Sequence, residues 1–341
     1  MRWAARRRLR VLRSMALVAA AGGGVYGMIV SPDYATGLMV GVVTGLMIAV
    51  PLTLFELYFV DARAGERFRR LPFGWLLAAK TLVYLAVILV GLEASRRLTA
   101  VGDAPALRLD RVFLWNIVFS LAFAAVVNFV MQIRRVLGPG VLGNLIVGRY
   151  HRPREETRVF LFLDLVGSTA LAERIGGPRF LDLLNRLYMH MTEPIAEHGG
   201  EIHKYVGDEV IVTWRGDAGF ADANCVRCVF AIEDQLRSLA AFYEKTFGHV
   251  PRFRGGLHVG PVVTGEIGDL KQEIAFLGDG MNTTARLVDL CRERDRACVA
   301  SAAVLERLTL PAGIAAEPLG DIQLRGKSET LPVFALTRAA A

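Results

Sequence analysis

Two aspartates provide the side chains best suited to holding a metal ion beside a phosphate. Asp164 follows an apolar run and precedes Gly167-Ser168-Thr169, which has the form of a turn into a helix, and Asp208 lies in a tight loop. A carboxylate beside free backbone N–H groups can hold a hard cation on one side and phosphate oxygens on the other. Without competing Cys or His ligands, such acids suit Mg²⁺ or Mn²⁺. A helix N-cap for Asp164 and a turn residue for Asp208 are the ordinary alternatives, and the spacing leaves both interpretations open.

A second pair of residues is suited to binding a charged sugar phosphate. Asn282 and Arg286 are four residues apart, so they project from one face of a helix. A guanidinium stays charged and forks onto phosphate oxygens. A helix N-cap for Asn282 and a solvent-exposed position for Arg286 are the alternatives, and the pair alone does not decide between them.

Strand-like and helix-like patterns alternate from Arg158 onward, and these elements must position the four side chains. We expect strands at 159–165, 201–205, 209–214, 253–259, 262–266, 321–324 and 333–336, and helices at 168–175, 179–198, 221–247 and 282–294. The loop 206–208 joins two of the strands as a hairpin. This alternation predicts an α/β sandwich with a mixed sheet, and about 180 residues suffice for its core.

The first half of the chain has the composition of a membrane domain. The whole chain is 53% hydrophobic with a mean hydropathy of +0.38, too apolar for an ordinary soluble protein. Four apolar stretches, 14–30, 37–60, 71–92 and 112–131, each have about the length that crosses a bilayer. The first could pass for a signal peptide, but no clear cleavage pattern closes it before the next span. We therefore predict four transmembrane helices embedded in a lipid bilayer.

The net charge of +7 divides unevenly between the two halves. Residues 1–155 hold 20 Lys and Arg against 8 Asp and Glu, whereas residues 156–341 hold 20 against 25. Fifteen basic residues flank the spans in 1–14, 61–70 and 132–155, and four lie in 93–111. Positive loops stay on the cytoplasmic side, so both termini are predicted to be cytoplasmic. The positive charge is thus a topology signal and not a nucleic-acid footprint.

Two charges and three glycines stand out inside the spans. Glu56 and Lys80 lie at depths that allow an ion pair, and an interfacial Glu56 with a snorkelling Lys80 is the alternative. Gly37, Gly41 and Gly45 form overlapping GxxxG patterns, which indicate close packing against another helix of this chain or of a partner.

Four stretches of the second half resemble, in order, the motifs of the class III nucleotidyl cyclase catalytic domain. They are FLFLDLVGST at 160–169, HKYVGDE at 203–209, FLGDGMNTTAR at 276–286, and LRGK at 324–327 followed by PVF at 332–334. The resemblance implies a ferredoxin-like mixed sheet. It divides the chain into a membrane domain (1–131), a connector (132–157) and a catalytic domain (158–341).

The resemblance also implies a role for each residue of the site. Two Mg²⁺ or Mn²⁺ ions would be bound by Asp164, Asp208 and the Leu165 carbonyl. The β- and γ-phosphates would be bound by the backbone of Gly167, Ser168 and Thr169, and the terminal phosphates also by Arg325 with Lys271. Asn282 would bind the ribose, and Arg286 would bind the α-phosphate. In this two-metal arrangement one ion activates the ribose 3′-hydroxyl and the other neutralises the triphosphate.

The choice of base rests on Lys204, which matches the purine-recognition lysine of adenylate-type enzymes. An ammonium can donate to adenine N1, whereas guanine carries N1–H there. The second purine contact of the family falls on Ala275, so recognition of the exocyclic amine would need backbone or water. ATP is favoured. A guanylate or relaxed-specificity cyclase and a catalytically silent nucleotide-binding receptor are the alternatives.

Metal acids and the Asn/Arg pair come from two different domains in each site of this family. Because this chain has one domain holding both sets, a homodimer is implied. The expected protein is an adenylate cyclase of the cell (inner) membrane that converts ATP to 3′,5′-cyclic AMP and pyrophosphate on the cytoplasmic side. Its membrane half is a candidate to bind an unidentified membrane or extracytoplasmic ligand.

Overall fold

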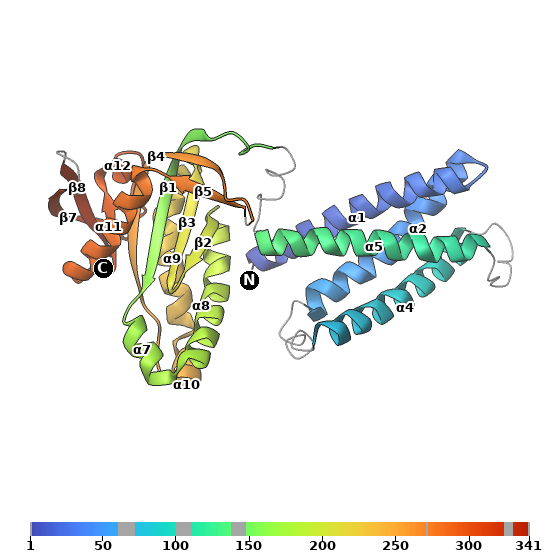
Figure 1. Cartoon of the computed structure of the whole chain (residues 1–341), viewed down its shortest axis with the longest axis horizontal. Coiled ribbons are helices and arrows are strands. Elements are labelled where there is room, and N and C mark those ends of the chain that lie inside the picture. The colour runs from blue at the N-terminus through green and yellow to red at the C-terminus, as the bar shows by residue number, and fades with distance from the viewer. Residues whose placement is uncertain are drawn as a thin grey trace. The chain divides into compact units, whose positions relative to one another are not determined.

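The computed structural model describes residues 2–60, 72–99, 111–137, 148–270, 272–323 and 330–339. The chain divides into two compact units, Met1–Ile133 and Arg134–Ala341. Figure 1 shows the first unit as long helices and the second as a sheet with helices. Each unit is described by itself.

The described part of the first unit is built from long apolar helices. These are α1 (Arg2–Val30), α2 (Tyr34–Phe55) with the π-helical turn η1 (Glu56–Val60), α4 (Phe73–Thr99) and α5 (Arg111–Leu137). Four stretches are long and apolar enough to cross a bilayer: Arg8–Val30, Tyr34–Phe59, Ala78–Thr99 and Arg111–Val130. Four apolar helices were predicted, and four are found.

The glycines of α2 pack against α1 of the same chain. A methyl group added at Gly41 would overlap the backbone oxygen of Gly23, and one added at Gly37 would overlap that of Gly27. Only residues without a Cβ allow two helix backbones to approach this closely. The partner helix that the sequence left open is therefore α1.

Glu56 and Lys80 form an ion pair in the first unit. Lys80 Nζ lies 2.7 Å from Glu56 Oε1, and both side chains are largely buried. The Tyr84 hydroxyl donates to the same carboxylate oxygen at 2.6 Å, and Asn128 Nδ2 donates to the Tyr84 hydroxyl at 2.6 Å. The paired interpretation holds, and the network ties η1 to α4 and α5.

The second unit is built on an eight-stranded mixed sheet. Its strands are β1 (Arg154–Leu165), β2 (Glu201–Val206), β3 (Glu209–Arg215), β4 (Phe253–Ile267), β5 (Glu273–Leu277), β6 (Cys298–Ser301), β7 (Ile314–Gln323) and β8 (Thr330–Arg338). The order is β2-β3-β1-β4-β6-β8-β7, with β5 also on β4. The described pairs are antiparallel except for β4 with β6, which confirms a mixed sheet.

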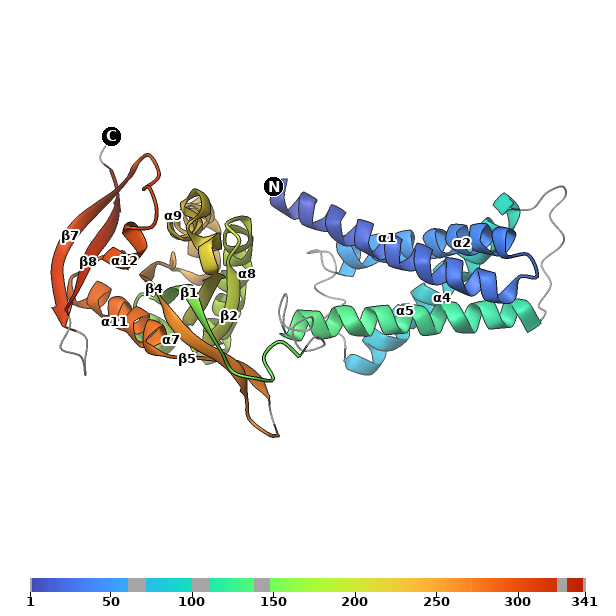
Figure 2. The same cartoon turned by 90° about the horizontal axis from the view of Figure 1, so that it is seen from above.

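Helices cover both faces of this sheet. They are α7 (Ser168–Ile175), α8 (Gly177–Glu197), α9 (Asn224–Ser238), α10 (Ala240–Phe247), α11 (Asp279–Glu293) and the short α12 (Ala302–Leu305). The odd-numbered residues of β1, such as Leu161, pack in the core beneath α8 and α9, whereas Phe160 and Phe162 pack with Val288 of α11. Figure 2 shows α8 and α9 together on one side of β1 and α11 on the other. β1 is buried on both faces from Val159 to Leu163, and this part of the strand is an unbroken apolar run.

β4 connects the beginning of β1 with β5. It pairs with β1 from Phe253 to Thr264, and Thr264 is in register with Arg154 of β1 on one edge and with Phe276 of β5 on the other. The backbone N–H of Glu266 donates to the Tyr150 carbonyl just before β1, at 3.2 Å.

Several predicted elements were wrong in extent. The predicted helix 221–247 is three pieces, the 3₁₀ turn η4 (Ala221–Ala223), α9 and α10, because Leu239 leaves helical geometry at ψ 9°. The predicted strands 253–259 and 262–266 are the single strand β4, since pairing with β1 runs through Pro261. β1 begins at Arg154 instead of 159, and α11 at Asp279 instead of Asn282. β5, β6 and the 3₁₀ turn η3 (Gly216–Gly219) were not predicted.

Candidate active site

The two aspartates lie at the same end of the sheet. Asp164 is in register with Glu209, the first residue of β3, and Asp208 occupies the turn before it. Burial, and then the charge of Asp208, raise the pKa of Asp164. Asp164 is not a helix N-cap, because Gly167 occupies that position of α7. The side chain is therefore available for another role.

Glu209 adds a third carboxylate that the sequence analysis missed. Burial, followed by the charges of Asp164, Asp208 and Asp289, raises its pKa to about 7. Its position directly after Asp208 was the available signal. Negative charges that raise one another's pKa are the electrostatic condition that a bound cation relieves.

The donor set at this edge fits a divalent ion only with help from a ligand. Among the described residues, no group of three or more His, Cys, Asp and Glu side chains could hold a metal by itself. Two carboxylates with backbone and phosphate oxygens are the kind of ligand set in which Mg²⁺ is usually bound. The residues present are thus compatible with the predicted ions.

Two arginines close to Asp164 were also missed. Arg292 of α11 places a guanidinium nitrogen 3.1 Å from Asp164 Oδ2. Arg254 of β4 is in register with Asp164 across the β1–β4 pair, and its charge acts to lower the pKa of that carboxyl. Neither belongs to a motif that the sequence analysis used, and cross-strand register is not readable from one sequence.

The backbone between Asp164 and α7 has the predicted form. Leu165 ends β1 and is buried, and Gly167 adopts a left-handed conformation with φ +70°. Ser168 and Thr169 open α7, where the first N–H groups of a helix have no intrahelical acceptor. Because α7 begins two residues after β1 ends, these amides lie close in the chain to Asp164.

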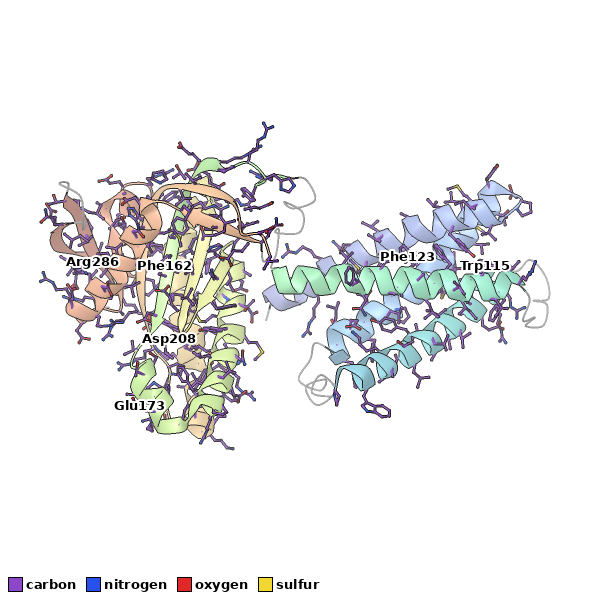
Figure 3. All side chains as sticks on the ribbon, viewed as in Figure 1. Trp115, Phe123, Phe162, Glu173, Asp208 and Arg286 are labelled. Carbon is purple, nitrogen blue, oxygen red and sulfur yellow. The ribbon has the colours of Figure 1, made fainter. Side chains whose placement is uncertain are left out.

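Asn282 and Arg286 share α11, but the structure does not bring them to Asp208 within one chain. Arg286 lies 3.8 Å from Asp289 and 3.7 Å from Glu293, and its side chain is half exposed. Figure 3 labels Asp208 and Arg286 apart from each other. α11 nevertheless reaches the acids further along the helix, because Arg292 pairs with Asp164.

Lys204 has a carboxylate partner that the sequence analysis missed. Its Nζ lies 3.1 Å from Oε1 of Glu273, which is on β5 two residues before Ala275. Lys271 and Arg325, which were also predicted to contact phosphate, lie outside the described residues.

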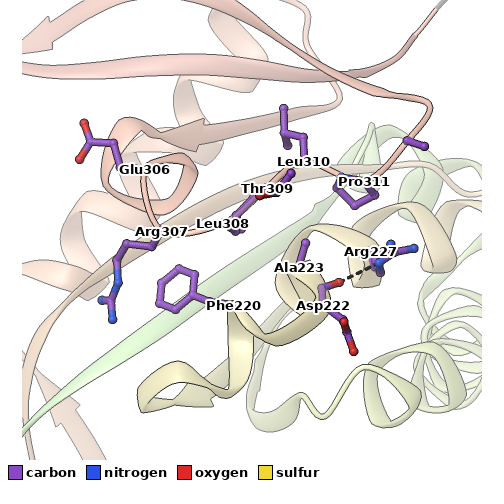
Figure 4. Close-up of a pocket in the computed structure, with 11 residues that line it drawn as sticks. Phe220, Asp222, Ala223, Arg227, Glu306, Arg307, Leu308, Thr309, Leu310 and Pro311 are labelled. Carbon is purple, nitrogen blue, oxygen red and sulfur yellow. Dashed lines mark hydrogen bonds between the residues drawn. The ribbon is translucent and has the colours of Figure 1, made fainter.

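A hollow elsewhere on the domain contains none of the predicted site residues. Figure 4 shows it between the loop after α12 and the start of α9, with a volume of about 670 Å³. Arg227 Nε donates to the Asp222 carbonyl at 2.7 Å there. Its lining holds no residue of the acid cluster, so it is distinct from the candidate site.

Comparison with known proteins agrees with this geometry. The family model described as "Adenylate and Guanylate cyclase catalytic domain" matches residues 150–337. Adenylate cyclase 2 of Rhizobium meliloti (strain 1021) is 39% identical over 324 residues, which are 94% of this chain and 88% of that protein. Adenylate cyclase 1 of the same organism is 26% identical over 179 residues, 51% of this chain and 26% of its own length.

A solved structure supports the fold. A bacterial light-regulated adenylyl cyclase superimposes with a TM-score of 0.55 at 24% identity, covering 63% of this chain and 62% of that chain. The resemblance inferred from the four motifs is thereby confirmed. The chain is an enzyme of the adenylate and guanylate cyclase family, and residues 150–337 match that family's catalytic domain.

Proposed function

We propose that this protein is a membrane-bound adenylate cyclase that converts ATP to 3′,5′-cyclic AMP and pyrophosphate. The observation that carries the proposal is similarity to an adenylate cyclase over 94% of the chain, which includes the apolar helices as well as the catalytic domain. Asp164, Asp208, Asn282 and Arg286 are all present, which argues against a catalytically silent receptor.

Asp164, Asp208 and the Leu165 carbonyl are the groups that would hold two Mg²⁺ or Mn²⁺ ions. Such ions supply charge neutralisation at the triphosphate and a more nucleophilic ribose 3′-hydroxyl. Burial, followed by neighbouring carboxylates, raises the pKa values of Asp164 and Glu209, and a bound cation would stabilise their charged forms. The backbone amides at Gly167, Ser168 and Thr169 bind the β- and γ-phosphates.

The α11 pair acts on the reacting groups. Asn282 binds the ribose and orients its 3′-oxygen, which attacks the α-phosphorus as the bond to the bridging oxygen of pyrophosphate breaks and the hydroxyl proton leaves to solvent. Arg286 stabilises the charge that grows on the α-phosphate, a task for which a permanently charged fork is suited. Lys204 donates to N1 of adenine.

Two copies of the chain complete each site. Among the described contacts, Arg286 pairs with Asp289 and Glu293 and not with Asp208, which supports a homodimer in which each chain supplies acids to one site and the α11 pair to the other. Large apolar side chains are exposed at the end of β2 and on the β4–β5 arm, the part of β4 that pairs with β5 together with β5 itself and the residues that join them. A partner chain would cover these side chains. They are Val206, Val263, Ile267, Leu270 and Leu277.

The catalytic domain would lie on the cytoplasmic side of the cell (inner) membrane. Four apolar helices and the basic flanks of the spans support this topology. The membrane domain (1–131) would bind an unidentified ligand, and the connector (132–157) would pass the signal to the catalytic domain (158–341).

Complementation between two inactive chains tests the shared site. Asp208→Ala and Arg286→Ala chains, co-expressed with different tags and purified as mixed dimers, should recover about half the wild-type turnover, since one of two sites is intact. As a control, Asp208→Ala paired with the chain carrying both substitutions should stay inactive. Full activity of either single variant, or silence of the mixed dimer, would contradict the mechanism.

Ala275 makes relaxed base specificity the second candidate, because its methyl side chain offers no hydrogen bond to the purine. Assays of the full-length protein with ATP and GTP under Mn²⁺ separate the two functions. A markedly better rate with GTP would overturn the assignment of Lys204 and favour a guanylate cyclase.

A further inference from the structure

Lys204 and Glu273 form an exposed ion pair between two strands that are distant in sequence. Lys204 Nζ lies 3.1 Å from Glu273 Oε1, and the side chains are 47% and 38% exposed. An exposed pair of this kind contributes little to stability, roughly 0–1 kcal/mol. Because one member of the pair is the proposed base-recognition lysine, the position of Glu273 suggests a role in ligand binding.

Strand alternation places Glu273 and Ala275 on the same side of β5. Successive side chains point to opposite faces, so Ile274 and Phe276 belong to the other side. Phe276 packs there against the His203 ring at a centroid distance of 4.3 Å and under the Arg158 guanidinium at 4.4 Å.

β2 has a bulge at His203, so its contacts and not strand alternation show where these side chains lie. His203 stacks on Phe276, and Lys204, its neighbour, reaches Glu273. Lys204 therefore meets the side of β5 that carries Glu273 and Ala275. A base held by Lys204 would meet this side of β5.

The chemistry of the pair matches the edge of adenine. A lysine ammonium has donors only, and a carboxylate has acceptors only. Adenine presents an acceptor at N1 beside a donor, its exocyclic amine. An adjacent donor and acceptor can therefore engage both groups at once, whereas Ala275 can engage neither.

We infer that Glu273 accepts the hydrogen bond from the exocyclic amine of ATP and is, with Lys204, the base-reading pair of this enzyme. The inference rests on the proposed function and refines its substrate choice. It also replaces the expectation that backbone or water recognises the amine. Glu273 supplies the acceptor that Ala275 lacks, since both side chains leave the same face of β5.

An analogue without the amine isolates the contact. Purine riboside 5′-triphosphate keeps N1 and lacks the exocyclic amine. For the full-length wild type in detergent, we expect kcat/KM for ATP to exceed that for the analogue by about 10- to 100-fold, the range of a hydrogen bond to a charged group. Glu273→Ala should reduce this ratio to about 1, because it should raise KM for ATP more than KM for the analogue.

A matched substitution controls for the loss of an ion-paired glutamate. Glu317 of β7 is half exposed, and its carboxylate lies 3.3 Å from Arg296. Glu317→Ala therefore removes a similar pair elsewhere and should leave the ratio of kcat/KM for ATP to that for the analogue unchanged. Glu273→Gln, which keeps an acceptor, should give an intermediate ratio. If Glu273→Ala lowers activity on both nucleotides equally, Glu273 only neutralises Lys204, and the inference is wrong.

Nucleotide binding separates this inference from the proposed function. Displacement of a fluorescent ATP analogue from the same proteins reports the preference for ATP without turnover. A wild type that binds ATP selectively but forms no cyclic AMP would contradict the proposed activity, and loss of that selectivity in Glu273→Ala would still support the inference. Unchanged selectivity in Glu273→Ala would overturn it.

Discussion

The guanidinium of Arg292 lies 3.1 Å from the carboxylate of Asp164, so one of the two proposed metal acids carries a counter-ion from α11. Arg292 is 61% exposed and reaches a carboxylate that is 18% exposed. A divalent ion that binds Asp164 has to replace this contact or share the carboxylate with it.

Removal of this counter-ion should strengthen metal binding. Arg292→Gln eliminates a competing cation, and an exposed pair of this kind contributes up to about 1 kcal/mol, so the Mn²⁺ concentration for half-maximal activity should fall about fivefold. Metal titrations of cyclic AMP formation measure the change. Arg294→Gln, an exposed arginine two residues away, serves as the control. An unchanged or higher metal requirement in Arg292→Gln would show that the pair does not compete.

The stability of the catalytic domain should depend on pH through His203. Burial, followed by the charges of Lys204 and Arg158, lowers the pKa of His203 to about 4. The unfolded chain takes up a proton near pH 6.5 and the folded chain does not, so the contribution of His203 to the free energy of unfolding falls as pH falls from about 6.5 to about 4, by at most about 1.4 kcal/mol per pH unit. Glu209, whose pKa is raised to about 7, contributes with the opposite sign.

Substitution of His203 should flatten this profile. Trp214 is buried on β3 and reports unfolding of the domain once Trp3, Trp75 and Trp115 are replaced by Phe. In that background, the free energy of unfolding of His203→Gln should change less with pH between pH 4 and 6.5 than that of its parent. His151→Gln, at an exposed histidine, should keep the slope. Equal slopes in all three proteins would remove His203 as the cause.

The Glu56–Lys80 pair should be coupled energetically. Lys80→Met leaves a buried carboxylate unpaired and should cost about 3 kcal/mol, seen as a lower midpoint of heat denaturation in detergent. The double substitution Glu56→Gln with Lys80→Met removes both charges and should recover much of the loss. Additive effects of the two single changes would mean that the pair makes no net contribution.

The α1–α2 glycine contact should not tolerate side chains. Gly41→Leu would insert a side chain where a single methyl group already overlaps the Gly23 backbone, so we expect a loss of several kcal/mol and poor recovery of folded protein. Met39→Leu, on an exposed face of α2, is the matched change and should behave as wild type. Normal folding of Gly41→Leu would argue against the close helix approach.

The elements nearest the motifs were the most predictable from sequence. The helix 168–175 was predicted with the observed bounds, because Gly167 before it and Gly176 after it limit it on both sides. The hairpin around Asp208 was equally clear, since two short strand-like runs flank a glycine turn. Local signals alone were sufficient in both cases.

The rest depended on contacts between distant residues. Glu273 is 69 residues from Lys204, and only the folding of the β4–β5 arm brings them together. Arg254 became part of the site through its register with Asp164, which no periodicity encodes. The break at Leu239 is likewise tertiary, because α9 and α10 form one amphipathic pattern in the sequence.

The strand β4 connects β5, which carries Glu273 of the base-reading pair, directly to the beginning of β1. Thr264 is bonded in register to the first residue of β1 on one edge and to β5 on the other, and Tyr150 just upstream accepts a hydrogen bond from Glu266. A displacement of the chain where it enters the catalytic domain would therefore reach β5 and Glu273 through two rows of backbone hydrogen bonds. Substrate selection and signal reception would then depend on the same strand, β4. A stimulus would change which nucleotide is accepted as well as how fast it is converted.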